Sequence, residues 1–332
     1  GIGMGLPGMV SLDQTTVRYP PNLPFLDGVN AAEEVSSRTQ LTCKIENDAN
    51  IAALGSLHFG AGKGHDNFIM LTLGTGVGGG IIINRQLFKG SKGMAGELGH
   101  IILDYHGPLS NSVTRGTIEA YLGQRFLSRF AMDMITQNPN NSLYQKFSKD
   151  FDKLEPVDLT QAANAGNDLA IEILAKAGQR LGYAIINYTH MMDIRTYVLS
   201  GGVSKAGEWL FQPARDIVKK HMMPPFQEGF EIIYEDLADY AKLLQVHLNG
   251  GFCEDTQVLS EAAIESMQVD RGGVVATNAT PYGMGWWIQT NNPGVLTDPG
   301  AFGAVSFIDV NRGIGGYMAI DEYGDQADLG AP

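Results

Sequence analysis

Two short polar segments contain residues whose types and spacing could do chemistry. The first, ENDAN at residues 46–50, places Glu46, Asn47 and Asp48 between an apolar strand pattern and an alanine-rich helix pattern. A carboxylate beside other polar groups suits a general base with a neighbouring residue that orients it. An aspartate at the start of a helix is also a common N-cap, so the segment by itself leaves both interpretations open.

The second segment, GELGH at residues 96–100, sets Glu97 and His100 close together, and Glu119 follows in IEAYLG. Carboxylates and an imidazole can satisfy the donors and acceptors of a hydroxyl-rich ligand. A metal site is the alternative, but it would need more ligands than this pair; His106 is near in sequence and no cysteine is. We therefore expect a clamp for ligand hydroxyls.

Two glycine-rich segments could approach a phosphate. Glycines let backbone amides come close to an anion, and a threonine hydroxyl adds a donor. Segment 73–80, between two apolar strand patterns, contains Gly74, Thr75, Gly76, Gly78, Gly79 and Gly80, all of which we expect in the turn. Segment 199–207 places Gly201 and Gly202 between a strand and a helix, where an anion or nucleotide could bind. A plain hairpin and a common α/β turn are the respective alternatives.

Alternating strand and helix patterns over the first 234 residues predict an α/β fold. Apolar strands are expected within 43–47, 68–88 and 196–200, and long amphipathic helices over 116–135 and 169–192. The helix that follows ENDAN is expected to end at the glycines of 60–64.

Bulk properties exclude several classes of protein. The 332 residues carry a net charge of −13 with no basic stripe, which argues against a nucleic-acid surface. No apolar run reaches the roughly 18 residues of a membrane helix, and no signal peptide is recognisable. Cys43 and Cys253 are far apart and form no CxxC pair, so we expect a reducing, cytoplasmic location.

The motifs together resemble one family. ENDANIAALG, LTLGTGVGGGIIIN, GMAGELGHI, IEAYLG and VLSGGVSKAG occur here in the order found in the ROK family of bacterial sugar kinases and sugar-responsive repressors. The resemblance covers about residues 1–234. It implies an actin-like ATPase (ribonuclease H-like) sugar kinase fold, with residues 1–66 as the remnant of a small domain and 67–234 as the large domain.

The resemblance also assigns roles to residues. Asp48 matches the family's catalytic base, and the positions that hold the sugar are matched by Asn47, Glu97, His100 and Glu119. The nucleotide loops are matched by Gly74, Thr75, Gly76, Gly201 and Gly202. These roles imply a glucokinase-like enzyme that uses ATP and Mg²⁺ to phosphorylate a hexose, and a homodimer is common in the family. A sugar-sensing repressor is the alternative; the acidic charge and the retained Asp48 favour the kinase.

Two departures from the family pattern matter. Many members follow the GH with CxCGxxGCxE, whose cysteines bind zinc with the histidine, whereas HGPLSNSVTRGTIE here has no cysteine. We therefore predict no zinc and no other protein-bound metal. The family's N-terminal strand with its DxGGT phosphate loop is also missing from a sequence that begins GIGMGLPG. We expect an N-terminally truncated kinase that lacks half of the ATP clamp.

The last segment, residues 235–332, has a different sequence pattern. A helix pattern over 236–251 is followed by short strands at hairpin spacing, which predicts an α+β tail with an antiparallel sheet. This tail resembles the C-terminal part of serine β-lactamase-like hydrolases, with Asp298, Pro299 and Gly300 where their third motif would lie. Their SxxK and YxN elements have no counterpart here. We expect a structural appendage, and a hydrolase fragment is the third functional alternative.

Overall fold

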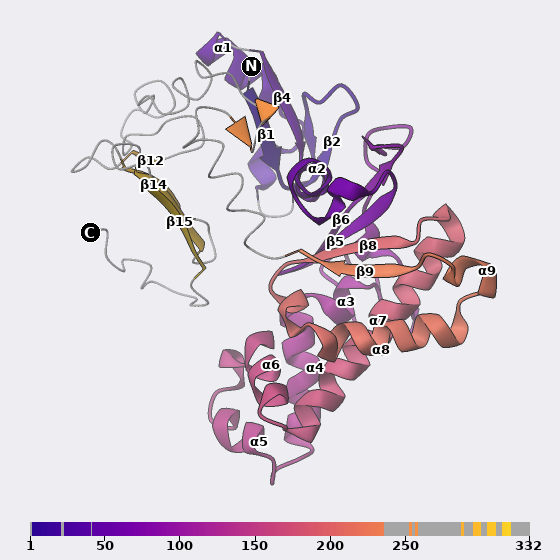
Figure 1. Cartoon of the computed structure of the whole chain (residues 1–332). Coiled ribbons are helices and arrows are strands. Elements are labelled where there is room, and N and C mark those ends of the chain that lie inside the picture. Colours follow the sequence, from indigo (N-terminus) through magenta and orange to yellow (C-terminus); the bar gives the residue numbers. More distant parts are fainter. Residues whose placement is uncertain are drawn as a thin grey trace. The chain divides into compact units, whose positions relative to one another are not determined.

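A computed structural model describes residues 2–20, 23–40 and 42–235, and beyond them six short strands between 252 and 319. The chain divides into two compact units, 1–33 with 42–235 and 34–41 with 236–332. Figure 1 shows the elements coloured along the sequence.

The described chain up to Glu235 contains both helices and strands. The helices are α1 (Ala31–Thr39), α2 (Asp48–Phe59), α3 (Glu119–Leu122), α4 (Gln124–Thr136), α5 (Ser142–Phe147), α6 (Pro156–Asn164), α7 (Asp168–Met192), α8 (Glu208–His221) and α9 (Pro224–Gln227). The strands are β1 (Ile2–Leu6), β2 (Met9–Val10), β3 (Val17–Arg18), β4 (Cys43–Asn47), β5 (Phe68–Leu73), β6 (Val77–Ile83), β7 (Gln86–Leu87), β8 (Thr196–Ser200) and β9 (Glu231–Tyr234). Short 3-10 turns include Ala61–Gly64, which follows α2 at the predicted glycines, and Leu98–His100.

A five-stranded mixed sheet in the order β7-β6-β5-β8-β9 forms the centre of the larger unit. β5 and β6 form the predicted antiparallel hairpin, whereas β5, β8 and β9 run parallel. The register pairs Thr72 with Ser200, so β5 and β8 end next to each other. A separate parallel pair, β1 with β4, leads into α2.

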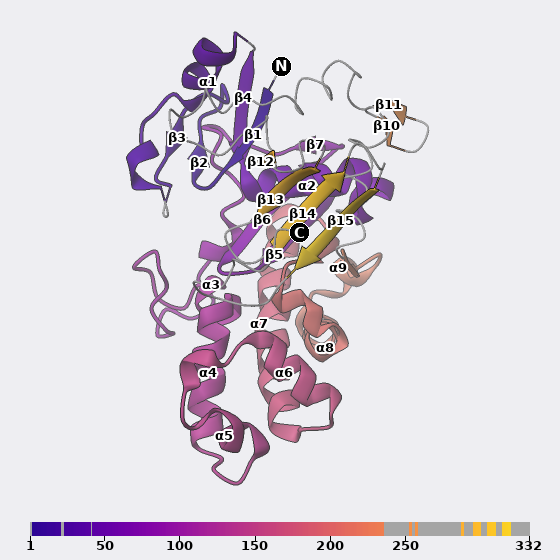
Figure 2. The same cartoon turned by 90° about the vertical axis from the view of Figure 1, so that its left-hand side faces the viewer.

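Helices cover both faces of this sheet. Since side chains alternate along a strand, Ile69 and Leu71 of β5 belong to the core cluster that contains α7 and α8, whereas Phe68 and Met70 pack with α2. Both views show α4, α5 and α6 gathered beyond α3, away from β1 and β4 (Figures 1 and 2). Helices on both faces of a mixed sheet thus give the layered α/β fold expected from the sequence.

Glycines inside β6 let α2 approach the sheet closely. A Cβ at Gly80 would lie 2.5 Å from the Cβ of Ala53, and one at Gly78 would lie 2.9 Å from the Cβ of Ala49. Gly79 points the other way, where a Cβ would lie 2.6 Å from Leu98 Cδ1. The prediction that these three glycines belong to the turn is therefore wrong. Only residues 74–76 lie between β5 and β6, and the other glycines are packing positions.

The helix predicted over 116–135 is broken in two at Gly123, which has an extended backbone (φ −64°, ψ 143°). The break frees the amide of Gln124 to donate to the carbonyl of Gly74 at 2.9 Å. A tertiary hydrogen bond has replaced a helical one, which the amphipathic pattern could not reveal. The break attaches α3 and α4 to the glycine turn after β5.

The second unit contains a four-stranded antiparallel sheet in the order β12 (Trp287–Ile288), β13 (Val295–Pro299), β14 (Ala304–Asp309) and β15 (Ile314–Ala319). β13, β14 and β15 are visible side by side in Figure 2. The expected antiparallel sheet is confirmed for these strands, and a two-stranded pair joins β10 (Phe252–Cys253) to β11 (Thr256–Gln257). The predicted helix over 236–251 lies outside the described residues. Among the described helices, none combines the length and apolarity needed to cross a bilayer.

The packing of α2 on β6 predicts opposite effects for two glycine substitutions. Gly80→Ala should lower the free energy of unfolding by about 1–3 kcal/mol, because its methyl group would overlap Ala53. Gly55→Ala in α2 is the matched control. A Cβ there meets nothing within 4 Å, so the substitution should raise stability by about 0.4–1 kcal/mol. Urea denaturation measures both, and equal effects of the two variants would contradict this account of the packing.

Candidate active site

Asn47 and Asp48 lie where β4 passes into α2. Asn47 is the N-cap, since its Oδ1 accepts a hydrogen bond of 3.0 Å from the amide of Asn50. Its Nδ2 donates to the carbonyl of Gly8 at 3.0 Å, which fixes the amide from both ends. Asp48 is the first residue of the helix, and the N-cap interpretation of Asp48 is therefore wrong. Its side chain is exposed and accepts a bond only from its neighbour's amide, that of Ala49, among the contacts identified for the described residues.

Glu97 and His100 form a weak ion pair in the 3-10 turn 98–100, with 3.6 Å between Glu97 Oε2 and His100 Nε2. Their side chains are 40% and 39% exposed, so a ligand can reach both. Desolvation raises the pKa of Glu97, His100 opposes this, and the negative charges of Asp48 and Glu119 add to it. The three carboxylates belong to segments that meet at the start of β6, where Glu119 accepts from the Val77 amide, Gly99 lies against the Val77 carbonyl and Ala49 packs at Gly78. Nothing in the sequence spacing fixes that juxtaposition.

Glu119 is the first residue of α3 and is only 9% exposed. Its Oε2 accepts a hydrogen bond of 3.3 Å from the amide of Val77, at the start of β6. A Cβ at Gly76 would overlap the same carboxylate oxygen. Gly76 thus leaves the space that Glu119 occupies, which is a packing reason for this glycine independent of any phosphate.

The two glycine turns leave the sheet from adjacent parallel strands. Gly74 donates to the carbonyl of Gly76 at 3.0 Å, and Thr75 between them is exposed. Gly201 has φ +94°, and a Cβ there would lie 2.5 Å from the carbonyl oxygen of Leu73. Gly202 has open space at its Cβ position. The structure therefore brings both predicted nucleotide turns together at the C-terminal ends of β5 and β8.

The segment after His100 is closed by hydrogen bonds. Leu103 donates to Gly116 at 2.8 Å, Gly116 to Pro108 at 2.8 Å, and Ser110 to Thr114 at 2.9 Å, all through backbone groups. Among the described residues there is no group of three or more His, Cys, Asp and Glu side chains that could hold a metal ion. The absence of zinc remains a prediction from the sequence.

Comparison with known proteins shows the family of this chain. The profile of the ROK family matches residues 1–244. The chain belongs to the ROK family. A glucokinase of Thermotoga maritima is 35% identical over 243 residues, which cover 73% of this chain and 76% of the relative.

Solved ROK structures share the fold. A ROK family glucokinase from Streptomyces griseus, in complex with glucose and AMPPNP, is 32% identical with a TM-score of 0.61; the match covers 70% of this chain and 75% of that one. The actin-like sugar kinase fold expected from the sequence is thereby confirmed. The xylose repressor of Bacillus subtilis is also related, at 28% identity over 244 residues, 74% of this chain and 59% of the repressor.

Two residues that support the segments of the candidate site were not identified from the sequence. The buried hydroxyl of Tyr188, near the C-terminal end of α7, donates a 2.6 Å hydrogen bond to the carbonyl of Leu98, and Lys89 forms an ion pair with Glu46. Tyr188 matches the ordinary apolar pattern of its helix, and Lys89 is one lysine in a loop. Neither has a local signal, because each acts on a segment distant in sequence.

The electrostatics of Glu97 predict that this residue lowers stability. A carboxyl whose pKa is raised by folding ionises first in the unfolded chain, so stability falls as the pH rises through the interval between the two pKa values and stays lower above it. Glu97→Gln should therefore raise Tm by about 1–3 °C at pH 7, with the gain shrinking toward pH 4.

Calorimetry from pH 4 to 7 measures this gain. Glu172→Gln, which removes an exposed carboxylate from α7, controls for the loss of one negative charge. A Tm of Glu97→Gln below that of the wild type at pH 7 would show that the site does not destabilise the carboxylate.

Proposed function

We propose that the chain transfers the γ-phosphoryl group of ATP to a hydroxyl of a hexose, as a glucokinase-like enzyme. The observation that carries the proposal is the accessible Asp48 carboxylate in one region with Glu97, His100 and Glu119. The 35% identity to a glucokinase and the Streptomyces griseus structure with glucose and AMPPNP support it.

In this mechanism Asp48 is the general base. The hexose is held through hydrogen bonds from its hydroxyls to Asn47, Glu97, His100 and Glu119. Asp48 accepts the proton of the attacking hydroxyl as the oxygen forms its bond to the γ-phosphorus, and the bond from that phosphorus to the β-phosphate oxygen breaks to release ADP. Orientation of the two substrates supplies most of the rate, since phosphoryl transfer needs little covalent chemistry from the protein.

The glycine turns would hold the nucleotide. Backbone amides at Gly74–Gly76 would face the phosphates with the Thr75 hydroxyl, and Gly201 and Gly202 would lie on the adenosine side. Mg²⁺, when bound with the nucleotide, neutralises charge on the transferred group. Such an ion is commonly held by phosphates and water with few protein ligands.

A sugar-responsive repressor is the second candidate. The similarity to the Bacillus subtilis xylose repressor favours it, although the chain spans 59% of that protein's length. A sensor needs the hydroxyl clamp but has no need of a base, so the accessible Asp48 favours the kinase. The homodimer, the small- and large-domain division at residues 66 and 67 and the hydrolase-like origin of the tail remain predictions from the sequence.

Substitution of the base separates catalysis from sugar binding. Asp48→Asn should lower hexose-dependent ADP release by a factor of about 10²–10⁴, because the attacking hydroxyl loses its proton acceptor. Glucose affinity measured by calorimetry should change little, since the amide can still hydrogen-bond. Asp216→Asn, on the exposed surface of α8, is the control and should keep full activity.

The assay should be run with a panel of hexoses. Equal turnover by Asp48→Asn and the wild type would remove Asp48 from the reaction. Wild-type sugar binding without turnover on any hexose would favour the repressor.

A pair of adjacent glycines tests the nucleotide site. Gly202→Ala should keep the wild-type Tm, because its φ of −61° suits alanine and its Cβ position is open. The added methyl should nevertheless raise the KM for ATP by about 3- to 10-fold while the KM for the sugar stays the same. Gly201→Ala should lower Tm as well, because of its positive φ and its contact with Leu73. An unchanged KM for ATP in Gly202→Ala would place the nucleotide elsewhere.

A further inference from the structure

The Glu46–Lys89 ion pair lies beside the residues discussed above but has no role in the reaction. Lys89 Nζ lies 2.7 Å from Glu46 Oε2, and the two side chains are only 16% and 6% exposed. Burial of two charges is costly, so such a pair is maintained only with good geometry and further hydrogen bonds. The question is therefore what this pair holds in place.

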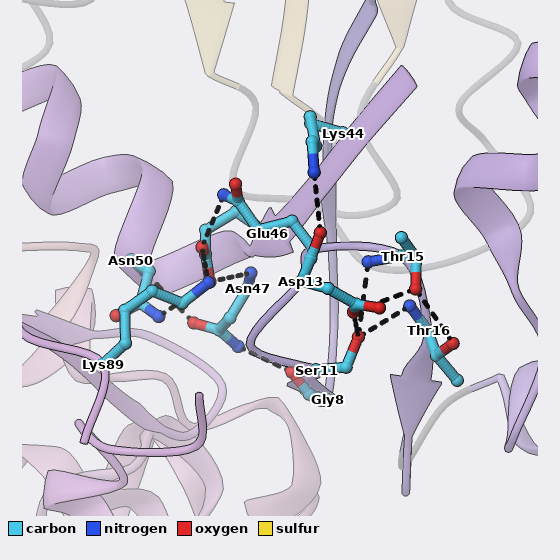
Figure 3. A network of polar contacts seen from close by, with 11 residues as sticks. Gly8, Ser11, Asp13, Thr15, Thr16, Lys44, Glu46, Asn47, Asn50 and Lys89 are labelled. Atoms are coloured by element: carbon cyan, nitrogen blue, oxygen red, sulfur yellow. Dashed lines mark hydrogen bonds and ion pairs between the residues drawn. The ribbon is translucent and has the colours of Figure 1, made fainter. Parts of the chain in front are cut away.

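Glu46 provides the further hydrogen bonds. Its Oε1 accepts from the Asn47 amide and from Asn50 Nδ2, both at 3.1 Å, and its Oε2 also accepts from Gln14 Nε2 at 3.2 Å. Figure 3 shows these bonds converging on one carboxylate. Burial by itself raises the pKa of Glu46, but the bonds from Lys89, Asn50 and Asn47 outweigh it and the pKa is lowered. The carboxylate is thus ionised at neutral pH.

The two partners belong to the two segments that would hold the sugar. Glu46 directly precedes Asn47 and Asp48 in β4, whereas Lys89 opens the loop that ends in Glu97 and His100. The Glu46–Lys89 contact therefore affects how far Asp48 lies from Glu97 and His100.

The loop that begins at Lys89 is held in place by a hydrogen bond and by close packing. The amide of Ala95 donates to the carbonyl of Lys89 at 3.2 Å, which closes the loop on itself. Gly93, at φ +86°, lies so close to the β2 end that a Cβ would be 2.7 Å from the amide nitrogen of Leu12. At the far end, Tyr188 holds the carbonyl of Leu98. Lys89 and Tyr188 thus hold residues 89–100, the clamp segment, near its two ends.

We propose that the Glu46–Lys89 ion pair is a positioning device for sugar recognition, which sets the separation between Asp48 and the Glu97–His100 clamp. The proposal rests on the proposed function for its choice of ligand. Neither side chain contacts the reacting atoms. Loss of the pair would let the two halves of the site separate, and small misplacements of this kind weaken binding and catalysis strongly.

Charge-neutral replacement of both partners distinguishes positioning from stability. Lys89→Met alone leaves Glu46 buried without its cation and should lower Tm. The double variant Glu46→Gln/Lys89→Met leaves no buried charge and should recover much of that Tm. If the pair sets position, the double variant should still bind glucose about 10- to 100-fold more weakly, with the KM for ATP within about 2-fold of the wild type.

Lys176→Met is the matched control, because it breaks an exposed ion pair with Glu172 on α7, where the nitrogen and oxygen are 3.5 Å apart. It should leave both KM values and Tm unchanged. Wild-type glucose affinity in the double variant, or a parallel rise of both KM values, would overturn the positioning role.

A second measurement separates failure of this proposal from failure of the proposed function. Hydrogen exchange of the ligand-free protein should become faster in residues 89–100 of the double variant and stay unchanged in α8. Unchanged exchange in residues 89–100 would show that the Glu46–Lys89 pair does not hold this segment, whichever ligand the protein binds. If the wild type neither binds nor phosphorylates any hexose, the kinase proposal fails, and the exchange result still decides whether Glu46 and Lys89 hold the loop.

Discussion

The close approach of α2 to β6 is the constraint on which the candidate site depends. Without side chains at Gly78 and Gly80, Ala49 and Ala53 of α2 rest directly on the strand, so the start of the helix, where Asp48 lies, is held against β6. The clamp segment also contacts this strand, since a Cβ at Gly96 would lie 3.2 Å from the Gly79 carbonyl. One strand with three glycines therefore contacts both the helix that begins at Asp48 and the segment that holds Glu97 and His100, and larger residues would push the two apart.

The negative charges of the candidate site lower the stability of the fold, and other interactions compensate for this. Asp48, Glu97 and Glu119 are like charges; desolvation is the main cause of the raised pKa of Glu97, and repulsion from Asp48 and Glu119 adds to it. Glu46, one residue from this group, is the opposite case, because a lysine and several amides stabilise its negative charge. An acidic site open to ligand thus lies beside an acidic residue used as a rigid support, as expected where function and stability conflict.

The same scaffold serves both classes of ROK relatives. A glucokinase and a xylose repressor each match about three quarters of this chain, at 73% and 74%, so proteins of both kinds are related to it. Under the proposed kinase function, Asp48 must be accessible to accept a proton. Its side chain is exposed because Asn47, its neighbour, makes the N-cap and the contact to Gly8.

The sequence by itself determined the local chemistry: the strand–helix junction at Asn47 and Asp48, the paired Glu97 and His100, and the α/β alternation with its ROK motifs. Such features depend on neighbouring residues, so hydrogen-bonding type and apolar period are enough to recognise them. Only the tertiary structure decided that Gly78–Gly80 pack instead of turning, that Gly123 breaks a helix, and that Lys89 and Tyr188 support the clamp. Each of these depends on a contact between segments far apart in the chain, and no local pattern encodes which distant group will meet a given residue.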